Sequence, residues 1–125
     1  MAARYELSRL SLRPSRHAGV PDGAWWPADR CFAVQFARLL EQWPVSAGRI
    51  VGARYSRADW DDSPESLSVG GWRVRAAPFR RGNDRLLMVS LLGGQWRSIM
   101  IIPPATPVES AHRVLLAAAD GTFRA

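Results

Sequence analysis

The chain has 125 residues, 47% of them hydrophobic and 22% charged, which is the size and composition of one globular domain. We therefore expect a single domain over residues 1–125, with its core over about residues 9–120. The net charge of +6 favours acidic over basic partners, but the basic residues are all arginines scattered along the chain, so the charge indicates a mild electrostatic bias and not the footprint of a binding site.

One cysteine, Cys31, excludes an internal disulfide bond. The first seven residues lack the apolar run of a secretory signal, and the longest apolar stretches, 86–92 and 99–102, are far shorter than the roughly 20 residues of a membrane helix. We expect a cytoplasmic protein with no membrane span or anchor.

Alternation of polar and apolar residues over Arg9–Pro14 predicts a first strand, and residues 15–23 are typical of a loop. An amphipathic helix is expected next, beginning near Pro27 or Asp29 and ending at Pro44. Its apolar positions recur at helical spacing and are Phe32, Phe36, Leu39, Leu40 and Trp43. We expect Phe36 and Leu40 to lie in the core.

Two further strands are predicted in the middle of the chain. Residues 48–56 form the first, and an acidic turn exposed to solvent follows over residues 59–65. Residues 67–77 form the second, with Gly70-Gly71 marking a bulge or a close backbone approach inside it.

The clearest local signal is a hairpin. Residues 86–92 and 95–102 are apolar strands joined by Gly93-Gly94, a two-residue loop suited to primed turns. This turn predicts a core face made of Leu87, Val89, Leu91, Trp96 and Met100. It places the following residues on the other face: Leu86, Met88, Ser90, Arg97 and Ile99.

A capping box at Thr106 and Glu109, with Pro107 between them, predicts a second helix that runs to about Asp120 and ends at Gly121. The predicted order is strand, helix, four strands, helix. We expect an α+β domain with a mainly antiparallel five-stranded sheet and two helices packed on one face.

No motif of known chemistry is present. A calcium loop beginning at Asp59 fails because Pro64 occupies the glycine position and Gly70 the closing acidic position. Two isolated histidines and a cysteine next to packed apolar residues do not suggest a metal centre or a nucleophile. We expect no enzyme, no metal and no cofactor.

The adjacent residues Trp25 and Trp26 cannot both point the same way from an extended backbone. We expect one in the core and the other at the surface or on a partner. Two interpretations stay open: the pair closes the end of a small sheet, or it binds a ligand or partner.

Arginines gather on the predicted strands. Arg73 and Arg75 share one strand face, Arg49 and Arg54 lie on the preceding strand, and Arg97 is expected on the non-core face of the hairpin. An ordinary solvated, salt-bridged sheet face would show the same pattern. Our functional prediction is a non-enzymatic interaction or regulatory domain that binds a protein partner, or itself, through the tryptophan loop and this basic face. The alternatives are a nucleic-acid-binding module, single-stranded or non-specific, and a small-molecule-binding domain or enzyme of unknown chemistry.

The chain resembles a small uncharacterised family of high-GC actinobacteria over about residues 9–119. The most specific shared segment is Asp22–Pro27, with the sequence DGAWWP, and further support comes from Arg9–Pro14, Gly48–Ile50 with Tyr55 and Trp60, and Pro103-Pro104 before an alanine-rich helix. The resemblance implies a cytoplasmic domain that stands alone or nearly so, and it transfers no catalytic residue. Cys31 and Gln35 stand where the family tends to have acids, and the 82–84 turn also departs from its pattern.

Overall fold

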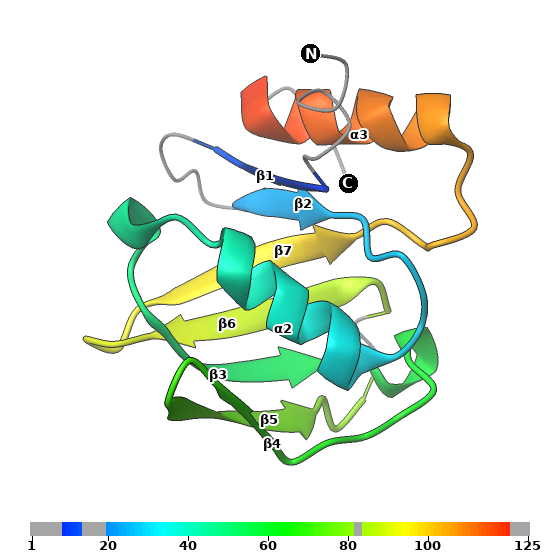
Figure 1. The fold of residues 1–125 in the computed structure, drawn as a ribbon. Helices are drawn as coiled ribbons and strands as arrows, with labels where there is room; N and C mark the ends of the chain where they lie inside the picture. The colour runs from blue at the N-terminus through cyan, green and yellow to red at the C-terminus, as the bar shows by residue number, and fades with distance from the viewer. Residues whose placement is uncertain (1–8, 14–19, 82–83, 121–125) are drawn as a thin grey trace.

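A computed structural model describes residues 9–13, 20–81 and 84–120 (Figure 1). Most of the predicted 15–23 loop, residues 82 and 83 of the predicted turn, and the expected helix end at Gly121 lie outside these residues. The described chain is an α+β domain with one sheet and two α-helices. Its elements are β1 Leu10–Leu12, β2 Gly23–Trp25, α2 Phe32–Gln42, η1 Val45–Ala47, β3 Ile50–Tyr55, η2 Arg57–Asp59, β4 Ser66–Val69, β5 Trp72–Pro78, β6 Leu86–Leu91, β7 Trp96–Ile101 and α3 Val108–Asp120.

The sheet is mixed and has seven strands in the order β1-β2-β7-β6-β3-β5-β4. β2 pairs with β7, and β3 pairs with β5, in parallel, while the other four neighbouring pairs are antiparallel. The predicted five-stranded, mainly antiparallel sheet is therefore wrong. The prediction missed β2 and merged β4 with β5.

β2 was hidden because three residues are too few for an alternation pattern to show. It lies between β1 and β7, in the interior of the sheet. Gly23 is required here, since a Cβ at this position would collide with the backbone carbonyl oxygen of Ser11 on β1. The segment that the sequence suggested was a surface loop thus joins the first strand to the rest of the sheet.

β4 and β5 form a hairpin at the place where a bulge was expected. Val69 pairs with Trp72, so Gly70 and Gly71 are the whole loop. Their φ angles are 59° and 91°, both in the positive range that glycine adopts at little cost. This two-residue loop with two positive φ angles is the primed turn that strand twist favours.

In the β6–β7 hairpin, the predicted register is wrong by one residue. Leu92 belongs to the loop, because the Leu91 N–H donates to the Gln95 carbonyl, and Leu87 therefore pairs with Ile99 instead of Met100. A shift of one residue turns every side chain of β7 to the other face. The buried positions of this hairpin are Leu87, Val89, Leu91, Ile99 and Ile101, whereas Trp96 is 40% exposed.

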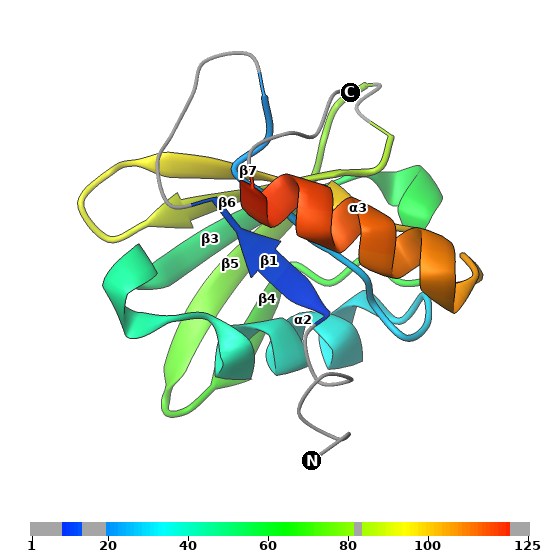
Figure 2. The ribbon, with the colours of Figure 1, turned by 90° about the horizontal axis from the view of Figure 1, so that it is seen from above.

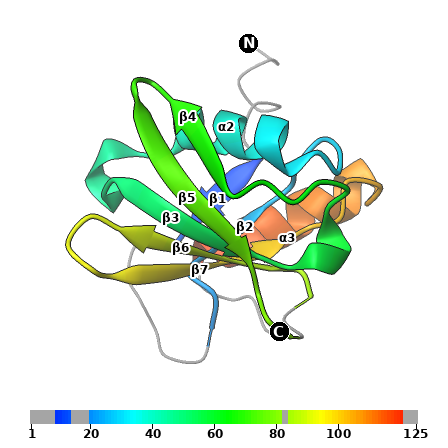
Figure 3. The ribbon, with the colours of Figure 1, turned by 90° about the horizontal axis from the view of Figure 1, so that it is seen from below.

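The two helices cover opposite faces of the sheet, so the predicted placement on one face is wrong (Figures 1 and 2). α2 packs over the larger core with Phe36 fully buried, as predicted, and Leu40 partly buried against it. α3 packs on β1 and β2 at one end of the sheet, over Ala24 and Trp26. Figure 3 shows that the sheet curves until the β4–β5 hairpin lies beside α2.

The predicted acidic turn is not a purely solvated one. The Asp62 carboxylate accepts hydrogen bonds from the backbone N–H groups of Phe32 and Ala33, at 2.6 and 3.0 Å, and so caps the first turn of α2. Trp60 is buried in the core, and Asp61 forms an ion pair with Arg30. The segment that follows β3 and η2 is therefore bonded to the start of α2.

Candidate interaction surface

Both tryptophans of the predicted binding loop are buried, with Trp25 2% and Trp26 8% exposed. Trp25 lies in the core below α2, and its ring centroid is 5.6 Å from that of Trp60. Trp26 lies on the other side of the sheet, where its indole N–H donates to the Pro104 carbonyl and the Arg9 guanidinium carbon lies 4.1 Å from its ring centroid. The two indoles do point to opposite faces, but both faces are covered here. The expectation that one is left for a partner is wrong.

Asp22, which precedes the pair, also has a structural role. One oxygen of its carboxylate accepts hydrogen bonds from the backbone N–H and the hydroxyl of Ser98, at 2.8 and 3.4 Å. The Asp22 N–H in turn donates to the Ser98 carbonyl. The segment therefore ties β2 to β7 and does not present a contact surface.

Three of the predicted arginines do share the uncovered part of one sheet face. Arg54 on β3 and Arg73 and Arg75 on β5 are exposed on the side of the sheet opposite α2, and α3 packs on the distant β1–β2 end. Gly52 pairs with Arg75, so Arg54 is the diagonal neighbour of Arg75 on the adjacent strand. Positive charge is therefore concentrated on one patch.

Within the described part of the chain, these arginines are not salt-bridged. Among the residues that the structure describes, Arg54, Arg73 and Arg75 have no ion pair or side-chain hydrogen bond. Arg30 illustrates the contrast, since it binds both Asp61 and the Ala58 carbonyl. The ordinary interpretation of a salt-bridged sheet face thus does not describe this surface.

Arg49 and Arg97 lie elsewhere. The guanidinium carbon of Arg49 lies 3.4 Å from the ring centroid of Trp72, beside a mainly apolar hollow of about 410 Å³ near the end of α2. Arg97 is on the same face as Ile99, the core side of β7, where it bonds to its own hairpin at Gln95 and Trp96. The predicted non-core position of Arg97 is wrong, for the same reason as the register.

The corrected register adds a residue that the sequence interpretation missed. Trp96 pairs with Ser90, which lies beside Gly52, which in turn lies beside Arg75. The indole therefore stands on the arginine face, separated from Arg75 by two small residues. Ile99, expected on this face, is fully buried on the other one, whereas Met88 and Leu86 are half-buried on this face as expected.

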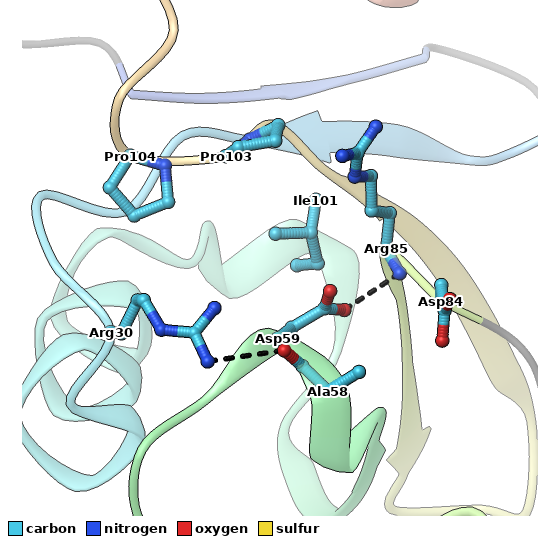
Figure 4. A pocket seen from close by; sticks show the side chains of 8 residues that line it. All are labelled: Arg30, Ala58, Asp59, Asp84, Arg85, Ile101, Pro103 and Pro104. Atoms are coloured by element: carbon cyan, nitrogen blue, oxygen red, sulfur yellow. Dashed lines mark hydrogen bonds between the residues drawn. The ribbon is translucent and has the colours of Figure 1, made fainter.

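A charged cavity of about 510 Å³ opens where β3 and β7 end (Figure 4). It is lined by Arg30, Ala58, Asp59, Asp84, Arg85, Ile101, Pro103 and Pro104. Burial is the main cause that raises the pKa of Asp59, and the hydrogen bond from the Arg85 N–H opposes it. Burial likewise raises the pKa of Tyr55, whose hydroxyl donates to the Pro64 carbonyl.

A family model described as "Family of unknown function (DUF5994)" matches residues 9–118. The chain belongs to this family. No curated protein and no solved structure matches it. The predicted resemblance to an uncharacterised family is thus confirmed, and the DUF5994 match covers the tryptophan segment, the arginine face and the charged cavity alike.

The described part of this DUF5994 domain contains no group of three or more His, Cys, Asp or Glu residues that could hold a metal ion. Neither described helix is long and apolar enough to cross a membrane. The Cys31 sulfur lies 3.9 Å from an oxygen of Asp62, but that carboxylate caps α2.

Proposed function

We propose that this domain is a non-enzymatic interaction or regulatory domain that binds an acidic surface of a protein partner. Its contact surface is the open face, which we define as Arg54, Arg73, Arg75 and Trp96 together with Ser66, Ser68, Met88 and Ser90. The observation that carries the proposal is three exposed guanidiniums without an ionic partner among the described residues, on the part of the sheet face that α3 leaves uncovered.

Arginine and tryptophan are the residue types that contribute most to protein interfaces. A guanidinium is weakly hydrated and binds a carboxylate through two parallel hydrogen bonds, so it loses less on desolvation than an ammonium does. Small residues between Trp96 and Arg75 let a partner approach the backbone of the sheet closely. Half-buried Met88 adds apolar contact area beside the charges.

The test is a quantitative affinity capture from a native extract with the wild-type domain and two triple variants. R54A/R73A/R75A removes the charge of the open face, whereas R38A/R113A/R49A removes the same charge elsewhere. We expect the first variant alone to lose captured proteins, and the lost proteins to bind less at high salt. Two results would contradict the proposal. In one, the two variants capture the same proteins in equal amounts; in the other, neither the wild type nor the variants capture any protein.

A second candidate is binding of single-stranded nucleic acid, and the position of Trp96 favours it. Bases stack on exposed aromatic rings while arginines contact phosphates, and this face has both. Three phosphate contacts to a single strand predict a log–log salt slope of about −2. Fluorescence anisotropy with a labelled oligothymidylate tests this, with Trp96→Ala and the first triple variant expected to weaken binding. No saturation at low salt would eliminate this candidate.

Self-association through the open face is the third outcome, and analytical ultracentrifugation of the wild type and R54A/R73A/R75A measures it. The cytoplasmic location and the actinobacterial origin stay predictions, as does the absence of enzymatic activity.

A further inference from the structure

The charged cavity lies at one end of the sheet and shares no lining residue with the open face. In Figure 4, Arg30 enters it from the segment before α2 and Asp59 enters from η2, with Ile101, Pro103 and Pro104 above them. A volume of about 510 Å³ is within the range of small-molecule sites. The cavity therefore combines opposite charges with an apolar wall.

One carboxylate oxygen of Asp59 is hydrogen-bonded, and the other has no partner among the described residues. Its Oδ2 accepts a hydrogen bond of 2.7 Å from the backbone N–H of Arg85, and among the described residues nothing bonds to Oδ1. Asp84 also lines the cavity, and its negative charge adds to that of Asp59. A cationic group on a ligand would be attracted to Oδ1 of Asp59, against the opposing charge of Arg85, which lines the same cavity.

Arg30 is fixed in the same way. Its Nε donates to Asp61 at 2.9 Å and its Nη2 donates to the Ala58 carbonyl at 3.1 Å. Nη1 has no partner among the described residues. A guanidinium anchored at two nitrogens, with the third available, is pre-organised to bind a carboxylate.

The backbone at Arg85 is in an uncommon conformation. Its φ of 61° is the one positive value that the structure describes for a residue other than glycine. The Arg85 N–H holds Asp59, and its carbonyl accepts a hydrogen bond from the Ile101 N–H at 2.9 Å, so both walls of the cavity depend on this residue. Backbone strain of this kind concentrates at functional sites.

We propose that the cavity binds an aliphatic α-amino acid, with the ammonium group on Asp59, the carboxylate on Arg30 and the side chain against Ile101, Pro103 and Pro104. A fixed anion and a fixed cation on different sides of one cavity fit a ligand that carries both charges. The prolines and the isoleucine offer the side chain no hydrogen bond, which favours an aliphatic one. A bound ammonium would also offset the burial that raises the pKa of Asp59.

The experiment is isothermal titration of the domain with three probes: L-leucine, L-leucinamide, which lacks the carboxylate, and 4-methylpentanoate, which lacks the ammonium. We expect L-leucine to saturate the site and each truncated probe to bind about tenfold more weakly or worse, because each loses a charge-assisted contact. Absence of saturation at ~10 mM L-leucine, or equal binding of all three probes, would overturn the proposal.

The variants separate the two contacts. Asp59→Asn keeps the acceptor for the Arg85 N–H but removes the charge, so it should weaken L-leucine and leave 4-methylpentanoate unchanged. Arg30→Gln should weaken L-leucine and leave L-leucinamide unchanged. R54A/R73A/R75A is the matched control and should bind L-leucine as the wild type does, so this proposal and the proposed function succeed or fail separately. Wild-type affinity in both cavity variants would refute the assignment.

Discussion

The Asp62 cap of α2 gives the sharpest stability prediction, because it rests on one side chain and has a neighbouring control. Asp62→Ala removes two hydrogen bonds to a carboxylate, of 2.6 and 3.0 Å, and a negative charge at the positive end of a helix dipole. Loss of an N-cap costs about 0.5–2 kcal/mol and hydrogen bonds to charged groups are worth about 1.5–3 kcal/mol. Since Asp62 is only partly buried, we expect a loss of about 2 kcal/mol.

Urea unfolding followed by tryptophan fluorescence measures this loss, and the melting temperature should fall by roughly 6–10 °C. Asp61→Ala is the control, since it removes an ion pair with side chains that are 46% and 72% exposed and should cost under about 1 kcal/mol. If the two variants unfold at the same urea concentration, the remote cap does not stabilise α2 and the reasoning is refuted.

Three further predictions concern packing and charge. Phe36→Ala should cost about 3–5 kcal/mol by calorimetry or denaturant titration, since its fully buried ring stacks on Phe32, and a loss under 1 kcal/mol would contradict the core assignment. Gly23→Ala should cost about 1–3 kcal/mol because its Cβ would collide with the Ser11 backbone carbonyl, whereas the control Gly52→Ala should cost less because its Cβ clashes only with the Ser90 hydroxyl, which can rotate away; equal losses in urea titrations would contradict this assignment. Burial raises the pKa of Asp59 above its unfolded value, so the folded state holds its proton more tightly and the ionised group lowers stability as pH rises through the folded pKa. Asp59→Asn should therefore gain stability relative to wild type in urea titrations as the pH rises above the ordinary pKa of an aspartate, and an unchanged difference would contradict the burial of this carboxyl.

The elements with a strong local signal were predictable from the sequence. α2, α3 and the existence of the β6–β7 hairpin follow from periodicity, capping residues and glycines that act over a few positions. The register of that hairpin did not follow, because whether Leu92 ends the strand or starts the loop depends on the pairing of Leu91 with Gln95. That single residue moved Trp96 and Arg97 to the faces opposite those predicted.

The mixed topology could not be read from local patterns. β2 pairs in parallel with a strand more than 70 positions later, and its three residues carry no alternation. The candidate surface was partly predictable, since Arg73 and Arg75 alternate along one strand and Arg54 lies beside them. Trp96 and the charged cavity were not, because both depend on which strand ends meet in space.

The tryptophan pair shows why a distinctive sequence is not by itself a binding site. A segment buried on both faces needs a large side chain on each side, and Trp25 at the end of β2 and Trp26 directly after it supply both. Each indole then needs one contact with the rest of the fold: Trp25 packs on Trp60, and the Trp26 N–H reaches Pro104. The tryptophan pair is thus explained by packing, because Trp25 fills the core under α2 and Trp26 fills the core under α3. Residues that the packing of the fold does not explain are the better guide to function. Here they are the exposed arginines of β3 and β5, and the Asp59 Oδ1 and Arg30 Nη1 atoms that have no partner among the described residues.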